Sequence, residues 1–252
     1  MDEGSHWYTR EGKPMYQIEK KGGGFRPVNL AWDRKLNPVP SVTTVLQVVA
    51  KPQLNKWQQD QMMLAALTLG KEPDEPDDIF CKRIRKDAFL QVDEAAAKGT
   101  AIHDALEKYF TGEAVPGEYE SDVVGVLREL HTMFPEIDDW VAEKSFAHHM
   151  GFGGRVDLHS PSTGVVVDFK GKDGDFSDGK RIAYDQHWQL AAYQVGLWLP
   201  KAECANIFFS RTHPGKAKGH RWTPEEIDYG FDVFYAALSL WKVAKRYDPS
   251  FC

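Results

Sequence analysis

The sequence predicts an α/β fold in which a small mixed β-sheet is flanked by helices. Alternating and Val-rich runs, separated by turns that contain Gly and Pro, indicate strands at 141–150, 153–160 and 164–172. Runs rich in Ala, Leu, Glu and Lys, with apolar residues three and four apart, indicate helices at 79–110 and 184–199. Helices before and after a group of strands are typical of one sheet covered by helices.

The N-terminal part of the chain differs from this pattern and is expected to form a lobe of its own. Short strand-like pieces come first, either Ser41 or Thr43 is placed to cap a short helix, and residues 53–69 have a helical pattern. The Pro- and acid-rich stretch KEPDEPDD then indicates a surface loop. We therefore expect a helical N-terminal lobe at residues 1–75 and a core domain at residues 76–252.

The remaining elements of the core follow from local signals. A helical pattern covers residues 121–134, and CANIFFSR at 204–211 is typical of an apolar strand. Thr223 followed by Glu226 matches a capping box, and the helix that it begins is expected to end near Lys245. Three large aromatic residues are assigned to the hydrophobic core: Trp188, Trp198 and Phe208.

Charge and cysteine content exclude several classes of protein. The chain has 37 acidic and 31 basic residues and a net charge of −6, which argues against a protein that coats nucleic acid through a basic surface. An enzyme that acts on nucleic acid remains compatible, because carboxylates around a metal ion contribute negative charge. The three cysteines, Cys81, Cys204 and Cys252, form no CxxC pair, so neither a zinc ribbon nor an iron–sulfur cluster is expected.

No segment of the sequence indicates a membrane or the secretory pathway. No run approaches the roughly 20 apolar residues that a membrane span needs. The N-terminal residues MDEGSHWYTREGKP are polar and lack the apolar stretch of a signal peptide. A cytoplasmic protein without membrane contact is therefore expected.

Two strands of the predicted core carry charged residues in otherwise apolar runs. Asp157 lies in GGRVDLHS, and Asp168 and Lys170 lie in GVVVDFKGK. Side chains alternate along a strand, so Asp168 and Lys170 share one face with Cα atoms about 6.5 Å apart, which leaves room for a substrate oxygen between them. A hairpin would bring Asp157 alongside, and two hard oxygen ligands at one point suit Mg²⁺ or Mn²⁺. Lys170 would then assist an attacking water or offset charge that develops on phosphate.

The alternative to a metal site is an Asp–Lys ion pair on an exposed strand. Asp is disfavoured in strands, and the VVVDF run has the composition of a buried one, where charged residues are costly. The pattern therefore favours a hydrolytic site that uses a metal ion.

The ordered set of motifs H…GGxxD…DFK…QxxxY resembles the PD-(D/E)xK nuclease superfamily and, within it, the RecB-like exonucleases. The set comprises GTAIH around His103, the two carboxylate strands, and QLAAY at Gln189–Tyr193. PSVTTVL at 40–46 is similar to an N-terminal signature of exonucleases of the mitochondrial genome maintenance type and their phage relatives. The resemblance spans roughly Pro40–Leu199 and implies a restriction-endonuclease-like core.

The resemblance also implies which residues bind a metal ion and which assist the reaction. The metal ion would be Mg²⁺ or Mn²⁺, and Lys170 would be the catalytic lysine. The implied metal ligands are His103, Asp157, Asp168 and the carbonyl of Phe169.

Four further residues are expected around this centre. Gln189 and Tyr193 lie one helical turn apart on one face, and in the family that pair supports the lysine and the substrate. Glu107 and Glu143 are candidates for positions around the metal ligands, and Glu107 could also contact the metal ion through a water molecule. Gly171 follows the lysine where relatives commonly have Thr or Ser, so no hydroxyl contribution is expected there.

The sequence is therefore expected to encode a metal-dependent DNA exonuclease that hydrolyses phosphodiester bonds from DNA ends. Its substrate would be single-stranded DNA or DNA with free ends, guided by the N-terminal lobe as an arch in which Trp32 or Trp57 stacks on bases. The expected setting is DNA repair, replication or recombination in a bacterial or phage-infected cell, together with proteins of those processes. Two alternatives stay open: a nuclease-fold module that binds DNA or a protein without cleavage, and a DNA or RNA endonuclease.

Overall fold

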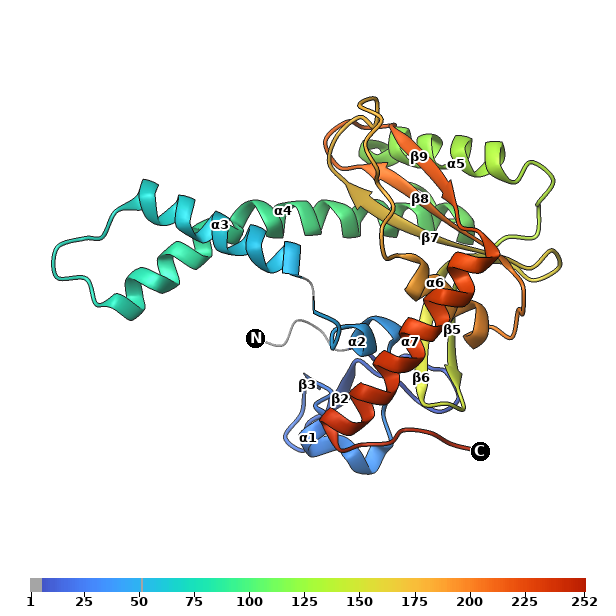
Figure 1. Ribbon diagram of the computed structural model, residues 1–252, viewed down its shortest axis with the longest axis horizontal. Helices are drawn as coiled ribbons and strands as arrows, with labels where there is room; N and C mark the ends of the chain where they lie inside the picture. The colour runs from blue at the N-terminus through green and yellow to red at the C-terminus, as the bar shows by residue number, and fades with distance from the viewer. Residues whose placement is uncertain (1–5, 51) are drawn as a thin grey trace. The chain divides into compact units, whose positions relative to one another are not determined.

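The computed structural model describes residues 6–50 and 52–252 and contains a five-stranded mixed β-sheet (Figure 1). The strands follow the order β5-β6-β7-β8-β9, and neighbours are antiparallel except β7 and β8, which are parallel. The middle strand is therefore β7, the strand that carries the Asp–Lys motif. The strands are β5 Val141–His148, β6 Phe152–Ser160, β7 Val165–Lys172, β8 Glu203–Ser210 and β9 Ala217–Arg221.

Helices cover both faces of this sheet. The helices α6 (His187–Gly196) and α7 (Pro224–Lys245) pack together, and α6 lies on the face to which Asp168 points. On the opposite face α5 (Glu120–Met133) packs against β8 and β9 (Figure 1). Close packing there requires Gly125, because a Cβ at that position would lie 2.5 Å from the carbonyl oxygen of Gly215. The predicted mixed α/β fold with a sheet between helices is confirmed.

The last helix begins as its sequence predicts. Thr223 is the N-cap of α7, with Glu226 N donating to Thr223 Oγ1 at 3.2 Å and Thr223 N donating to Glu226 Oε2 at 2.9 Å. These reciprocal bonds satisfy two backbone donors that the first turn of a helix leaves unpaired. α7 ends at Lys245, followed by Arg246 in the left-handed conformation.

The hydrophobic core lies between the sheet and the α6–α7 pair. Phe152 of β6, Phe208 of β8 and Phe234 of α7 are each completely buried, and their neighbours in the same cluster include Leu190 and Trp241. Each buried side chain of this kind contributes roughly 1.5–3 kcal/mol. The two helices and the site-bearing strands are therefore fixed to one core.

Residues 6–49 form short elements that belong to the same compact unit as the sheet. Trp7 and Tyr8 of β1 are buried, and Ser41 forms a β-bridge with Gly153 of β6. Ser41 also caps α2, because its Oγ accepts from Thr44 N at 3.0 Å. The elements are β1 Trp7–Tyr8 paired with β4 Val39–Pro40, β2 Gln17–Glu19 paired with β3 Phe25–Pro27, α1 Leu30–Asp33, the 3-10 helix Arg34–Leu36 and α2 Val42–Leu46; a second 3-10 helix, Gly117–Tyr119, precedes α5.

A second compact unit comprises Ala50–Asp104, whereas the first comprises the chain up to Val49 together with Ala105–Cys252. The second unit contains α3 (Pro52–Leu69) and most of α4 (Asp77–Thr111). The lobe expected at residues 1–75 differs from this division, because residues 6–49 belong to the unit of the sheet and the second unit begins at Ala50.

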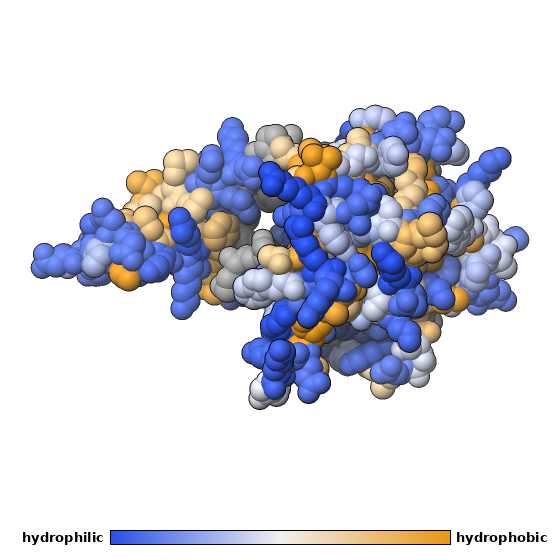
Figure 2. Space-filling view, turned by 90° about the horizontal axis from the view of Figure 1, so that it is seen from below, coloured by the Kyte–Doolittle hydropathy of each residue, from blue (hydrophilic) through white to orange (hydrophobic). Residues whose placement is uncertain are grey.

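The second unit presents apolar side chains to solvent. Met63, Leu64 and Leu67 of α3 and Ile79 of α4 are exposed, and Figure 2 shows apolar groups among the charged ones over these two helices. None of the described helices combines the length and apolar character needed to cross a membrane.

Candidate active site

Asp157 and Asp168 meet where β6 and β7 separate. The two strands pair through three residues each, ending with Leu158 opposite Val167. At the next position Asp157 Oδ2 accepts a hydrogen bond from the backbone N–H of Phe169 at 2.7 Å. A side-chain carboxylate thus takes the place of a ladder carbonyl, and the antiparallel pair brings the two aspartates to one point.

Asp168 is held by nitrogen donors from three different elements. Lys170 Nζ of β7 lies 2.7 Å from each carboxylate oxygen. Gln189 Nε2 of α6 donates to Oδ1 at 3.0 Å, and Asn206 Nδ2 of β8 donates to Oδ2 at 2.7 Å. The side chain is 1% exposed, so these donors compensate a charge that burial alone would make very unfavourable. The space predicted between Asp168 and Lys170 is closed by their direct ion pair.

Lys170 is the more accessible partner of this pair, with a side chain that is 32% exposed. Burial acts to lower the pKa of Lys170, but the charges of Asp168 and Asp157 outweigh it, and the pKa is raised. Burial also raises the pKa of Asp157, against the opposing effects of Lys170 and the Phe169 N–H. Lys170 is therefore an ammonium ion at neutral pH, suited to donate hydrogen bonds rather than to accept a proton.

Gln189 and Tyr193 act on Asp168 as a connected pair. Gln189 Nε2 lies 2.7 Å from Tyr193 Oη as well as 3.0 Å from Asp168 Oδ1. Tyr193 is buried against β6, where a Cβ on Gly154 would lie 2.8 Å from its Cε1 atom. Burial and the Asp168 charge raise the pKa of Tyr193 well above its usual range, so the phenol stays neutral. Because Gly154, the second glycine of GGRVD, has no side chain, the Tyr193 ring can pack directly against it.

Asn206 is a site residue that sequence reasoning alone did not identify. It is completely buried opposite Asp168 in the parallel β7–β8 register. Its amide group donates to Asp168, while its Oδ1 accepts from Trp222 Nε1 at 2.8 Å. The available signal was a single amide in the apolar strand CANIFF, where a polar side chain requires a buried partner.

Arg155 adds a positive charge beside the aspartates. It precedes Asp157 by two residues on β6 and therefore shares its face. Its Nε lies 2.5 Å from Glu143 Oε2, so the structure places Glu143 on Arg155. Glu107 lies close enough to interact electrostatically with both Asp157 and Arg155. Of the two acidic candidates, Glu107 is thus near one aspartate, and Glu143 is paired with an arginine.

The two remaining expected metal ligands are the carbonyl of Phe169 on β7 and the side chain of His103 on α4. Phe169 presents its backbone to Asp157, whereas its ring stacks on Phe110 at the opposite face, with centroids 6.4 Å apart. His103 lies on α4 one turn before Glu107, within the second compact unit. The two aspartates belong to the first compact unit.

The two aspartates suit one mode of divalent-cation binding. Among the described residues, no group of three or more His, Cys, Asp or Glu side chains gathers closely enough to hold a metal ion. Mg²⁺ is commonly bound by only one or two carboxylates and completes its shell with water and substrate phosphate, a mode that two aspartates fit. Because Lys170 contacts both oxygens of Asp168, a cation would take over part of that contact.

Comparison with known proteins assigns this chain to no family. No protein-family model matches it, and no curated protein matches it. Among solved structures, that of SSO0001 is similar over 74% of this chain and 86% of its own, with 14% sequence identity and a TM-score of 0.32. This TM-score is too low to assign a fold family or a function, so the function is inferred from the site itself.

Proposed function

We propose that this protein is a divalent-metal-dependent deoxyribonuclease with a RecB-like PD-(D/E)xK core that acts on DNA ends. The observation that supports this most strongly is the ion pair between the buried Asp168 and the partly exposed Lys170, beside Asp157 where two strands separate. Carboxylates that can bind a cation next to a lysine are what metal-assisted phosphodiester hydrolysis requires. The preference for DNA ends rests on the sequence resemblance.

The residues of the site have separate tasks in this reaction. A divalent cation bound to Asp157 and Asp168 would supply an activated water and offset phosphate charge. The Lys170 ammonium donates to a phosphate oxygen as negative charge develops in the transition state. Gln189 and Asn206 keep the Asp168 carboxylate in place while Lys170 changes partner. Arg155, on the same face and paired with Glu143, would add a second contact to the substrate backbone.

The proposal is tested by cleavage of end-labelled linear DNA and of covalently closed circular DNA with Mg²⁺, Mn²⁺ or EDTA. The linear substrate is expected to be degraded only with metal, while the circle survives. Lys170→Met should reduce the rate by roughly 10²–10³-fold, the usual effect of removing one donor to the transition state. Lys201→Met, on an exposed loop, is the matched control and should retain full activity.

The main rival is a nuclease-fold module that binds nucleic acid without cutting it. The specific observation in its favour is that Lys170, Gln189 and Asn206 engage both oxygens of Asp168. Binding of DNA with no cleavage of DNA or RNA in either metal would establish this rival. Cleavage of the circle would instead identify an endonuclease.

A further inference from the structure

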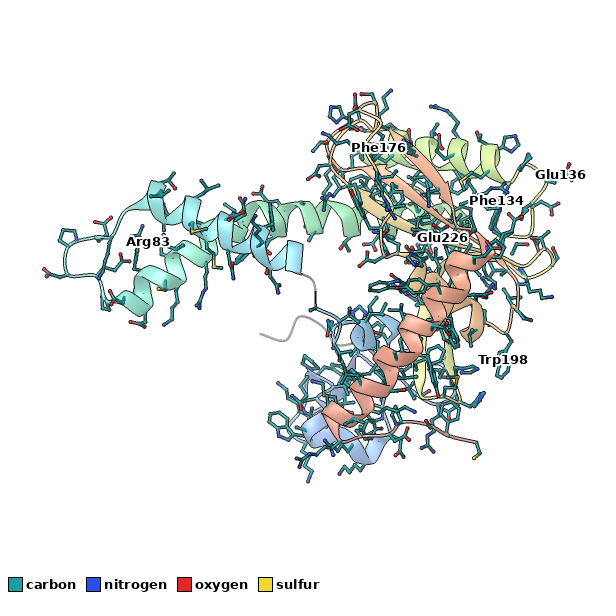
Figure 3. The ribbon with its side chains drawn as sticks, in the orientation of Figure 1. Arg83, Phe134, Glu136, Phe176, Trp198 and Glu226 are labelled. Atoms are coloured by element: carbon teal, nitrogen blue, oxygen red, sulfur yellow. The ribbon has the colours of Figure 1, made fainter. Side chains whose placement is uncertain are left out.

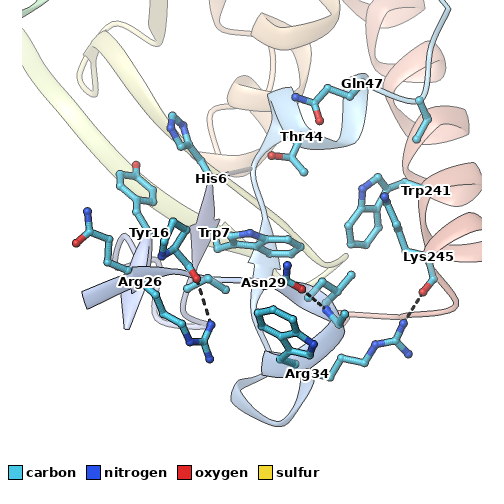
Figure 4. A pocket seen from close by; sticks show the side chains of 17 residues that line it. His6, Trp7, Tyr16, Arg26, Asn29, Arg34, Thr44, Gln47, Trp241 and Lys245 are labelled. Carbon is cyan, nitrogen blue, oxygen red and sulfur yellow. Dashed lines mark hydrogen bonds between the residues drawn. The ribbon is translucent and has the colours of Figure 1, made fainter. Parts of the chain in front are cut away.

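A cavity of about 850 Å³ lies in the first unit, away from the aspartates (Figure 4). Its walls come from residues 6–48 and from the C-terminal half of α7, and we call it the N-terminal cavity. Figure 4 shows His6 and Tyr16 at one end and Arg34 and Lys245 at the other. The volume lies at the upper end of the roughly 300–1,000 Å³ that small-ligand sites occupy.

The lining of the N-terminal cavity is positively charged, although the chain as a whole has a net charge of −6. Arg26, Arg34 and Lys245 line it, and no Asp or Glu is found among the lining residues that the structure describes. Asp33 orients Arg26 through two hydrogen bonds of 2.7 Å, and Arg34 donates to the carbonyls at the end of α7. Lys245 is exposed on the last turn of α7. Asp33 offsets most of the charge of Arg26, so Arg34 and Lys245 are the cations with which the cavity would attract an anion.

The same lining presents flat aromatic surfaces. Trp32 is 71% exposed, and the Arg26 guanidinium lies 5.8 Å from the centre of its ring. His6 and Tyr16 stack with ring centroids 4.6 Å apart. Trp7 is buried in the wall, and its indole N–H has no acceptor among the described residues. Stacking surfaces beside cations are the combination by which proteins bind single strands without sequence preference.

Arg155 precedes Asp157 by two residues on β6 and is paired with Glu143. This guanidinium interacts electrostatically with His6 and Tyr16, which line the cavity. It also interacts with Asp157, two residues further along β6. The residues that line the cavity and the two aspartates belong to the same compact unit.

We propose that the N-terminal cavity binds a single-stranded segment of nucleic acid, with a base stacked on Trp32 and phosphates near Arg26 and Lys245. Its continuation reaches the aspartates, which belong to the same compact unit. The second step, delivery of the strand to the aspartates, rests on the proposed function. The first step, binding of the strand, depends on the cavity alone.

The binding step is tested by fluorescence anisotropy of a labelled oligothymidylate with the full chain in EDTA. Trp32→Ala should raise Kd by roughly tenfold, the usual contribution of one stacked base. Lys245→Glu should raise Kd and lower the slope of log Kd against log salt concentration by about 0.7 for each phosphate that the variant no longer neutralises. Matched controls are Trp198→Ala, 67% exposed outside the cavity, and Lys201→Glu; both should leave Kd unchanged.

The outcomes separate this inference from the proposed function. Wild-type affinity in both Trp32→Ala and Lys245→Glu would overturn the cavity assignment, even if the protein cleaves DNA. Equal effects of these variants on a blunt duplex would overturn its assignment to single strands. Loss of oligothymidylate binding in both variants, with no cleavage by the wild type, would support the cavity and refute the nuclease.

Discussion

The aspartate site and the N-terminal cavity hold their polar groups in opposite ways. Asp168 is almost completely buried and is bonded to donors from β7, α6 and β8. Trp32 and Lys245 of the cavity are largely exposed. Groups that do chemistry in a dry interior need partners that also hold the fold together, whereas groups that only bind a ligand can stay in water. Substitutions in the aspartate site should therefore lower the free energy of unfolding, whereas substitutions of exposed residues in the cavity should not.

The largest difference is expected when Asp168 is replaced. Asp168→Ala leaves the donors of Gln189 and Asn206 buried without their acceptor and removes the partner of Lys170. Breaking a buried ion pair costs roughly 3–5 kcal/mol, and the free energy of unfolding should fall by about that amount. Urea unfolding measures it.

Trp32→Ala is the control for this comparison, because it removes a large side chain that is mostly in solvent. Its free energy of unfolding should stay within about 0.5 kcal/mol of the wild type. Equal destabilisation by the two variants would refute the contrast between a structural site and a binding surface.

A smaller effect is expected where the backbone of β6 supports the site. Gly154→Ala places a Cβ 2.8 Å from Tyr193 and 2.9 Å from Phe146, both of which are buried. Overpacking of this kind costs typically 1–3 kcal/mol. The displaced Tyr193 would also move Gln189 from Asp168, so DNA cleavage should decrease together with stability. Gly22→Ala meets no atom within 4 Å and should change neither quantity.

The sequence predicted the elements that depend on local pattern. Apolar runs between turns predicted the strands around Asp157 and Asp168, and the capping box of Thr223 predicted the start of α7. The proximity of the two aspartates followed from a short turn, because an antiparallel pair fixes its own register. Local rules were sufficient for these parts of the site.

Features that depend on distant parts of the chain were not predicted. Asn206 meets Asp168 only because β7 and β8 are parallel neighbours joined through α6, which no local pattern reveals. β9 was not predicted as a strand, because its sequence, AKGHR, lacks the β-branched residues typical of strands. Trp198 was assigned to the core and is 67% exposed, because the chain turns out of α6 there with a φ of +57° (Figure 3).

A pH-dependent effect is expected for His148, a buried side chain outside both regions. His148 packs against Phe152 and Trp198, and its Nδ1 has no hydrogen-bond partner among the described residues. Burial, with a smaller effect of His149, lowers the pKa of His148 from 6.5 to about 4. The unfolded chain therefore binds a proton as pH falls below 6.5, while the folded chain does not until about pH 4.

Folding stability should accordingly decrease as pH falls through this window, and the loss attributable to His148 between pH 7 and pH 4.5 should be about 2 kcal/mol. Urea unfolding at pH 7 and pH 4.5 measures it for the wild type and for His148→Asn, which cannot titrate. The variant starts from a lower stability at pH 7 because its packing is poorer, but it should lose less between the two values. An identical loss in both proteins would mean that other groups cause the acid sensitivity, and that burial of His148 without a partner has little cost.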